Sequence, residues 1–473
     1  MSAQSANPLP KFGPIYCLVL AALLLPASFA AAQDYTLTDI GPFAVPVALN
    51  SSGQVTGTTT QTGHDSSFFW TRTGGLQILP DLGSGTTDAK AMNDSGAIVG
   101  QSGLANHAIH AFLWTQAGGI KDLGSPLGGN SIAYAINPAG EVSGLTFSPD
   151  GAIVHAFFWS PSTGAIDLGV SNGNSTSFAL GMNGAGEIVG YQFGTTSGFT
   201  PFRWTQATGI ESLHDFGLPN GFAKAVNDNG EIAGYAAIAE KQTHAVKWSP
   251  DGTIQDLGTL SGTMSSNAFF INQSGHVAGY SRPTDCCGKQ RTFFWTPAGI
   301  VDIGLLPNHQ NGRSIPIGFN NRDQIVGSNG GTYLWSPTLG LRQIPGIKVN
   351  QLINHALNDA GQILGTRRSN LPAVLASPTM HVNVSSSQNP SNVGQNVTFT
   401  ANVSSIVGLP PDGEQVTFMD GATVLGTATL GSGSASFSTS SLVKGKHPIT
   451  ANYAGDDNYL PNKSAKLYQV VNP

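Results

Sequence analysis

Short apolar runs alternate with turn residues along most of the chain, and the same turn recurs in each unit of the pattern. Each turn reads Asn-x-x-Gly, with Asp323 replacing Gly in one copy, and another glycine follows seven positions after the Asn. Asn at the first position of a four-residue turn bonds the backbone two residues on, and Gly at the fourth accepts the left-handed conformation. The pattern predicts an antiparallel hairpin in every unit. The turns start at Asn50, Asn93, Asn137, Asn183, Asn227, Asn272, Asn320 and Asn358.

A further predicted strand in each unit carries a tryptophan, at intervals of roughly 44 residues, a period in the range of propeller repeats. An aromatic residue or a valine stands two positions before each Trp, and side chains two apart on a strand share one face. An apolar step ending in Asp-Leu-Gly or a near copy then follows, so each unit is predicted to hold four short strands. The tryptophans are Trp70, Trp114, Trp159, Trp204, Trp248, Trp295 and Trp335.

One such four-stranded sheet cannot bury both of its faces alone, so neighbouring copies must cover it, as in a β-propeller. Residues 35–41 form an Asp-Leu-Gly type strand with no Trp strand before it. The last unit has a weak Trp strand at residues 373–376 and no Asp-Leu-Gly strand after it. We therefore expect the N-terminal strand to complete the last blade and to close a ring of eight four-stranded blades. A different blade count or an open solenoid is the alternative.

The stretches His110-Ala-Phe-Leu-Trp114 and His155-Ala-Phe-Phe-Trp159, each followed by Asp-Leu-Gly and the Asn-x-x-Gly turn, resemble the bacterial extracellular HAF repeat. The resemblance covers residues 35–379 through the order and period of its motifs. It implies an exported bacterial protein and supplies no catalytic residues. The copies at Thr200-Pro-Phe202 and Arg291-Thr-Phe293 depart from the motif.

Residues 1–32 read as an export signal, with Lys11 before an apolar run at residues 15–25 and small residues before a cleavage site near Gln33. The run is short for a membrane span, so no span is expected after cleavage. Cleavage leaves Cys286 and Cys287, which either form a strained disulfide or stand as an incidental pair in a variable loop. Residues 33–379 are the predicted propeller.

The sequence points to no catalytic, cofactor-binding or metal-binding residue. Histidine recurs in the Trp strand at His110, His155 and His244, but the other units replace it, and catalysis needs one asymmetric cluster. The repeated aspartates fit turns that accept backbone hydrogen bonds, and Asn227–Glu231 falls short of a calcium-loop spacing. The Phe and Trp pairs recur in nearly every unit at a fixed phase, which favours packing between adjacent blades over a carbohydrate platform. The aspartates are Asp39, Asp81, Asp122, Asp167, Asp215, Asp256 and Asp302.

Residues that differ between units are where ligand specificity is expected, although no binding residue is assigned. The loops that vary are residues 192–200, 238–243, 282–290 and 308–313, and they are poor in carboxylates. Glu211, Glu240 and Asp285 are scattered candidates for catalytic carboxylates, and none of them is assigned that role. A net charge of -6 without a basic cluster argues against nucleic acid as a partner.

Residues 380–473 contain no Trp and show alternating polar and apolar runs typical of about seven short strands, as in an immunoglobulin-like sandwich. The stretches 416–421, 425–427 and 453–459 resemble a bacterial Ig-like domain, a module that implies a spacer or adhesive unit. The strands are predicted at 381–384, 396–403, 415–418, 423–429, 435–439, 446–453 and 466–471.

Two functions fit these features. The first is a secreted or cell-surface, monomeric binding or adhesion protein without catalytic activity or cofactor, whose extracellular ligand is a carbohydrate or a surface protein. The second is a secreted hydrolase or lyase acting on polysaccharide at the propeller channel mouth, a reading that rests on analogy.

Overall fold

The computed structural model describes residues 34–473 apart from 195–197, 284–288, 310–311, 352, 354 and 368–371. Asp34–Pro473 forms one compact unit. The predicted export signal, Cys286 and Cys287 lie outside the described residues. Within those residues the chain is all-β apart from one short 3₁₀ helix, η1 (Pro307–His309), and no helix among them is long and apolar enough to span a membrane.

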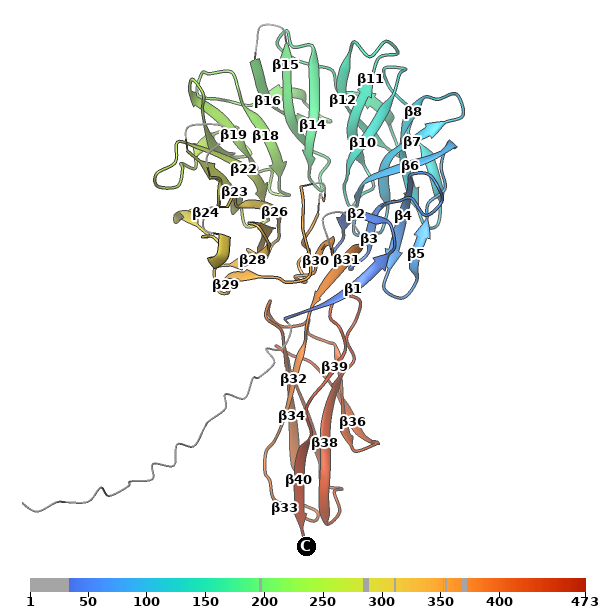
Figure 1. Cartoon of the computed structure of the whole chain (residues 1–473), viewed down its shortest axis with the longest axis vertical. Coiled ribbons are helices and arrows are strands. Elements are labelled where there is room, and N and C mark those ends of the chain that lie inside the picture. Colours follow the sequence, from blue (N-terminus) through green and yellow to red (C-terminus); the bar gives the residue numbers. More distant parts are fainter. Residues whose placement is uncertain are drawn as a thin grey trace, which may run out of the picture. The chain divides into compact units, whose positions relative to one another are not determined.

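Antiparallel four-stranded sheets follow one another along the repeat region, each in the strand order of the sequence (Figure 1). The first three groups of strands are β2 (Ala44–Leu49), β3 (Val55–Thr59), β4 (Ser66–Thr71) and β5 (Gly75–Ile78); β6 (Gly83–Met92), β7 (Ile98–Leu104), β8 (Ile109–Thr115) and β9 (Gly119–Asp122); and β10 (Ser131–Ile136), β11 (Val142–Phe147), β12 (Val154–Ser160) and β13 (Gly164–Asp167). The next are β14 (Thr176–Met182), β15 (Ile188–Gly194), β16 (Gly198–Thr205) and β17 (Gly209–Ser212), which join the preceding group through one parallel pair, Val154 with Thr176.

Three further four-stranded sheets continue the series. They are β18 (Phe222–Val226), β19 (Ile232–Ala239), β20 (Gln242–Trp248) and β21 (Ile254–Asp256); β22 (Ser265–Ile271), β23 (Val277–Arg282), β24 (Arg291–Thr296) and β25 (Gly299–Asp302); and β26 (Ile315–Phe319), β27 (Ile325–Ser328), β28 (Thr332–Ser336) and β29 (Gly340–Gln343). In each sheet the Asn-x-x-Gly turn joins the first strand to the second.

The N-terminal strand pairs with the last strand of the repeat region, as predicted. β1 (Tyr35–Gly41) runs antiparallel to β31 (Ala373–Pro378), with Tyr35 opposite Pro378 and Gly41 opposite Ala373 (Figure 1). β31 also pairs with β30 (Ile363–Thr366). The described residues of this unit form a three-stranded sheet, so the prediction of four strands is wrong here. Leu357, which precedes the turn, makes an isolated bridge to Ile363 instead of a continuous strand.

The recurring turns have the predicted conformation. At Asn50 the side-chain oxygen accepts hydrogen bonds from the backbone N–H groups of Ser52 and Gln54, and Gly53 has a φ of 73°. The glycine seven positions after the Asn is required for a different reason, which is lack of space for a side chain. At Gly144 a Cβ atom would overlap the backbone oxygen of Ile132 and come within 2.7 Å of the Phe157 ring, so the close approach of strand and ring excludes larger residues.

The side-chain amides of the same asparagines link successive sheets. Each Nδ2 atom donates a hydrogen bond to the backbone oxygen of the next turn Asn, for example Asn93 to Asn137 at 2.9 Å and Asn320 to Asn358 at 2.9 Å. The Asn358 amide donates at 3.0 Å to the backbone oxygen of Asn50. The series therefore returns to its first member.

Each Trp strand packs its aromatic face inside the repeat region. The exposed fraction of the seven tryptophans runs from 0% at Trp248 to 7% at Trp335. The residue before each Trp reaches the next sheet in several units: the Phe69 and Trp114 ring centroids lie 5.4 Å apart, and those of Phe158 and Trp204 lie 5.0 Å apart. Packing, the predicted role of the Phe and Trp pairs, is confirmed, because buried rings cannot form a platform for a ligand.

The C-terminal part is a two-sheet sandwich whose strands agree closely with the predicted ones. Two short strands, β33 and β39, escaped prediction because their pairing covers two residues each. One sheet has the order β32-β34-β37 and the other β33-β40-β38-β35-β36, with β39 beside β38. The strands are β32 (His381–Ser386), β33 (Ser391–Asn392), β34 (Val397–Ser404), β35 (Gln415–Asp420), β36 (Thr423–Thr429), β37 (Ser434–Thr439), β38 (Gly445–Tyr453), β39 (Asn462–Lys463) and β40 (Leu467–Asn472).

Candidate functional site

The recurring histidines pair with the recurring aspartates across neighbouring strands. His110 lies 2.9 Å from Asp122, and the pairs of His155 with Asp167 and His244 with Asp256 repeat the arrangement at 3.0 and 2.8 Å. In the sheet of β22–β25, Arg291 takes the place of His and pairs with Asp302 at 2.6 Å. The pair thus repeats along the chain and accepts Arg in place of His.

The same aspartates hold their own turns. Asp122 Oδ1 accepts a hydrogen bond from the Gly124 N–H at 2.7 Å, and Asp167 and Asp256 repeat this bond to Gly169 and Gly258. At Asp81 the N–H groups of Gly85 and Gly83 both donate to the carboxylate, and these bonds lower the pKa of Asp81. The predicted turn role is confirmed at these positions.

The described residues contain no group of three or more His, Cys, Asp and Glu side chains that could hold a metal ion. At the acidic turn Asn227–Glu231, the Glu231 carboxylate is engaged by Lys247 at 2.9 Å and by the Asn227 amide at 2.9 Å.

The structure brings together a different set of residues, in which the units do vary. The residue five positions before each turn Asn lies directly opposite the residue eight positions after it, on the neighbouring strand. We call these two residues the variable pair of a sheet. The variable pairs are Val45 and Thr58, Asp88 and Gln101, Ile132 and Leu145, Phe178 and Tyr191, Phe222 and Tyr235, Asn267 and Tyr280, and Ile315 and Ser328.

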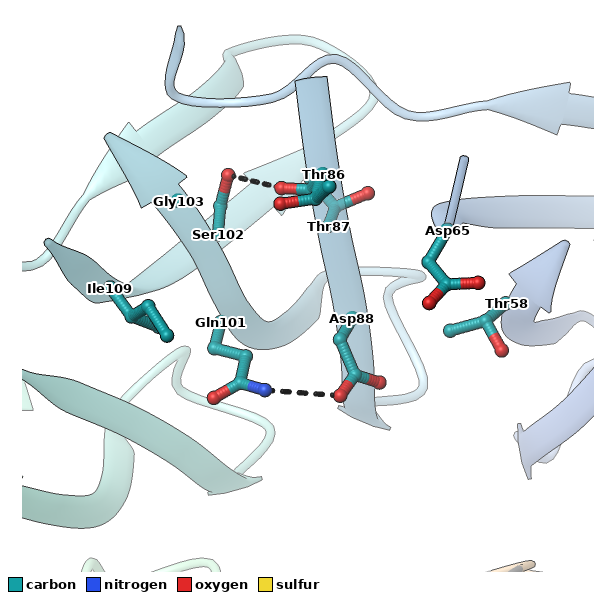
Figure 2. A pocket seen from close by; sticks show the side chains of 9 residues that line it. All are labelled: Thr58, Asp65, Thr86, Thr87, Asp88, Gln101, Ser102, Gly103 and Ile109. Atoms are coloured by element: carbon teal, nitrogen blue, oxygen red, sulfur yellow. Dashed lines mark hydrogen bonds between the residues drawn. The ribbon is translucent and has the colours of Figure 1, made fainter. Parts of the chain in front are cut away.

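Thr58 from the variable pair of the first sheet and both members of the second pair, Asp88 and Gln101, line a polar pocket of about 440 Å³ (Figure 2). Figure 2 shows Asp88 and Gln101 pointing toward one another from neighbouring strands, and the Gln101 amide donates to Asp88 at 3.1 Å. Asp88 also accepts from Lys90 at 2.6 Å. Thr58 and the exposed Asp65 also line this pocket, which is therefore acidic and rich in hydroxyl groups. The pocket offers hydrogen-bond acceptors and hydroxyls to a polar ligand.

In the sheets of β14–β17 and β18–β21 the variable pairs are aromatic. The rings of Phe178 and Tyr191 stack with centroids 5.1 Å apart and an interplanar angle of 6°, and those of Phe222 and Tyr235 stack at 4.9 Å. Tyr191 bridges the two sheets, because its centroid lies 4.5 Å from that of Phe222. These rings are half-buried, so their uncovered parts face solvent.

Further rings extend this aromatic cluster. Phe193 lies on the same strand as Tyr191, and Phe199 lies on β16 with 39% of its surface exposed. The Phe199 centroid is 4.9 Å from that of Phe222 and 5.6 Å from that of Phe193. In the next sheet Tyr280 packs against Phe269 at 5.2 Å. Aromatic groups therefore occupy equivalent places on three consecutive sheets.

Lys224 lies among these rings. Its Nζ atom is 5.2 Å from the Phe222 ring centroid and 5.9 Å from that of Tyr235. Burial lowers the pKa of Lys224 and raises the pKa of Tyr235 to about 12. Lys224 also lines a largely apolar cavity of about 420 Å³ together with Leu180 and Phe269. Among the described residues no carboxylate forms an ion pair with Lys224.

The loop at residues 192–200, predicted to carry specificity, contributes Phe193 and Phe199 to this cluster. The loop at 238–243 connects β19 to β20, and Arg282 ends β23. The loops at 282–290 and 308–313 lie partly outside the described residues. Sequence reasoning missed Tyr191, Tyr235 and Tyr280, although they share one position, directly after the recurring glycine.

Residues 384–472 match the family model described as "Bacterial Ig-like domain (group 3)". This part of the chain is a bacterial Ig-like domain. No curated protein matches the chain. The match covers most of the sandwich, whose strands span residues 381–472.

Several solved structures resemble the chain at low identity. A streptogramin B lyase matches with 11% identity and a TM-score of 0.40, covering 73% of this chain and 98% of that one. An oligogalacturonate lyase from Vibrio parahaemolyticus matches with 8% identity and a TM-score of 0.41, covering 73% and 94%. The extracellular domain of a one-component system from B. thetaiotaomicron matches with 12% identity and a TM-score of 0.36, covering 92% and 68%. Likenesses of this size assign no activity.

Proposed function

We propose that this protein is an exported, monomeric bacterial binding protein without catalytic activity, and that the variable pairs form its recognition surface for carbohydrate. The bacterial Ig-like domain at residues 384–472 supports an exported protein and would act as a spacer or adhesive module. The repeat region, which resembles the HAF repeat, would form a ring of eight blades. The Asn amide bonds that run from one turn to the next and return to Asn50 support that closure.

The observation that carries the proposal is the aromatic cluster at Tyr191, Phe222 and Tyr235. Half-buried aromatic rings at the surface leave apolar carbon atoms exposed that water solvates poorly, and such groups suit the C–H side of a pyranose ring. The structural aromatic residues of the repeat are buried in every unit, whereas these rings are present on a few consecutive sheets. Recognition explains a feature that the repeat itself does not require.

The carboxylates near the variable pairs support binding over hydrolysis. A glycosidase uses two carboxyl groups placed about a scissile bond, one of them protonated. Asp88 is held by Lys90 and Gln101, which both donate to it. These two contacts hold the carboxylate in one position, which suits a group that orients a ligand.

A glycan array and a parallel assay of reducing-end release on polysaccharides test the proposal. We expect binding without release, and we expect Tyr191→Ala and Tyr235→Ala each to weaken binding by about tenfold or more, as loss of an aromatic anchor does. Tyr468→Ala, on the Ig-like domain with 48% of Tyr468 exposed, is the matched control and should bind normally. Release that Asp88→Asn abolishes would overturn the proposal in favour of a hydrolase or lyase at the channel mouth.

A further inference from the structure

Two lysines occupy the same position in different sheets but have different surroundings. Lys90 stands three residues before Asn93, and Lys224 stands three residues before Asn227. In the first case the residue two positions earlier is Asp88, whose Oδ2 lies 2.6 Å from the Lys90 Nζ. In the second case that residue is Phe222, so the strand that supplies a counter-ion to Lys90 supplies an aromatic ring to Lys224.

The surroundings of Lys224 stabilise its charge only in part. Removing an ammonium group from water is unfavourable unless an opposite charge or hydrogen-bond acceptors replace the water. The faces of Phe222 and Tyr235 attract the cation, but cation–π contacts are weaker than a close ion pair in the same setting. Burial accordingly lowers the pKa of Lys224. A negatively charged group brought to this place would restore the missing partner.

The space beside Lys224 can admit such a group. Lys224 lines the cavity of about 420 Å³, together with Leu180 and Phe269 from the two neighbouring sheets. Leu180 is 39% exposed, so the wall next to Lys224 is open to solvent. A ligand could reach the ammonium group without displacing any ion pair, because none of the described residues forms one with it.

We propose that Lys224, Phe222 and Tyr235 form a subsite for an acidic sugar residue, whose carboxylate pairs with the ammonium group while its ring packs against the solvent-exposed parts of the aromatic side chains. This inference rests on the proposed function and narrows it to polysaccharides that contain uronic acids. A polymer suits the site because aromatic variable pairs recur on adjacent sheets: the ring centroids of Tyr191 and Phe222 are 4.5 Å apart across the two sheets. Successive sugar rings would meet successive aromatic groups.

The test measures the affinity of the full chain by isothermal titration calorimetry for three uronic acid polymers: polygalacturonate, polymannuronate and polyguluronate. Each is compared with its methyl ester, which keeps the sugar rings and removes the charge. We expect at least one acid to bind about tenfold to a hundredfold more tightly than its ester, as a charge-assisted hydrogen bond would give. Equal affinity for acid and ester, or no binding of any acid, would overturn the inference.

Two variants locate the effect. Lys224→Gln should remove the preference for acid over ester and leave the affinity for the ester within about twofold. Phe222→Asp should also remove the preference, because it places an internal carboxylate two residues before Lys224, as Asp88 stands before Lys90. Because it also removes an aromatic ring of the subsite, this variant should bind the ester more weakly. Lys446, whose Nζ lies 4.2 Å from the Tyr468 ring centroid in the Ig-like domain, supplies the matched control, and Lys446→Gln should keep the preference. Tryptophan fluorescence and the melting temperature show whether each variant is folded.

The outcomes separate this inference from the proposed function. One outcome is that neutral glycans bind, that Tyr235→Ala abolishes this binding and that Lys224→Gln does not alter it. That outcome would support the recognition surface and overturn the acidic subsite. If no glycan binds but an acidic peptide does so through Lys224, the polysaccharide assignment is overturned. If the acid preference persists in both Lys224→Gln and Phe222→Asp, the carboxylate is recognised elsewhere.

Discussion

The side-chain amide of Asn358 donates a hydrogen bond of 3.0 Å to the backbone oxygen of Asn50, a residue 308 positions earlier in the chain. The two residues hold equivalent turns, and the same bond joins each turn Asn to the next one along the repeat. The turn at Asn358 therefore contacts the first sheet in the same way as each other turn contacts the sheet that follows it. Contact between the first and last units gives every sheet a partner on both faces, which an isolated four-stranded sheet lacks.

Substitution Asn358→Ala should destabilise the repeat region by about 1–3 kcal/mol, because it leaves buried backbone groups without partners. Asn358 also accepts from the Gln362 N–H and donates to the Gln362 side chain. Asn320→Ala is a matched control, since Asn320 makes the corresponding bonds to Gln324 and Asn358. Urea unfolding followed by tryptophan fluorescence should show similar losses for both. An unchanged stability in Asn358→Ala alone would mean that the ends do not meet in solution.

Deletion of residues 34–41 should leave β31 as an open edge and should cause aggregation, because an unpaired strand is a template for pairing. Tyr35 is 2% exposed and donates from its hydroxyl to the Gly361 oxygen at 3.0 Å, so the deletion also empties part of a core. A synthetic peptide of residues 34–42 added during refolding should restore the monomer. Size-exclusion chromatography checks this result. A truncated chain that remains monomeric with an unchanged melting temperature would disprove the role given to β1.

Substitution Gly144→Ala should cost at least about 1–3 kcal/mol, the usual penalty of overpacking a filled space. The new methyl group would meet the Ile132 oxygen and the Phe157 ring, both of which belong to fixed parts of the sheet. Gly431→Ala is the control, because a Cβ atom there has no other group within 4 Å. Thermal unfolding of the two variants measures the difference. Equal melting temperatures would show that the repeat tolerates a side chain at this glycine.

The Ig-like domain should lose stability as the pH rises from about 6 to 8, because of His447. Burial alone would lower the pKa of His447, but hydrogen bonds to Asp420 at 2.6 Å and to the Val443 oxygen at 2.8 Å hold that pKa above its ordinary value. A raised folded-state pKa contributes stability that is complete below the unfolded pKa of about 6.5 and is lost as the pH rises through the folded value.

Nuclear magnetic resonance titration of the His447 ring should give a pKa above 6.5, and Asp420→Asn should lower it. In parallel, the free energy of unfolding of His447→Gln should depend less on pH than that of the unchanged protein over the same range. A pKa of His447 below the ordinary value would contradict the geometry of this pair.

The repeat could be read from the sequence because its turns demand particular residues. The Asn50 side chain accepts backbone hydrogen bonds in its turn, and Gly53 takes the left-handed conformation that closes it. Gly144 leaves room for the Phe157 ring. Because each unit has these requirements, the residues recur at fixed spacing. The incomplete last sheet was missed, since the strand before Asn358 is defined by pairing and carries no motif of its own. The pairing of β1 with β31 could be predicted because residues 35–41 have no Trp strand before them and the last unit has no Asp-Leu-Gly strand after its Trp strand.

The aromatic cluster could not be read in the same way, for a physical reason. In the first strand of each sheet the pairing register shifts near the turn. In β14, for example, the shift lies between Ala179 and Gly181. The shift breaks the alternation that normally tells which side chains share a face. Tyr191 and Tyr235 were visible as residues after a recurring glycine, but their contact with Phe222 depends on the packing of adjacent sheets.

Hydroxyl-radical footprinting tests most directly whether the aromatic cluster is the recognition surface. The oxidation rates of individual tyrosines are compared with and without the glycan that binds tightest on the array. The account predicts protection of Tyr191, Tyr235 and Tyr280, with no change at Tyr134 or Tyr468, which are 39% and 48% exposed elsewhere in the chain. Protection confined to Tyr134 or Tyr468, or unchanged oxidation of all five tyrosines under saturating glycan, would contradict it.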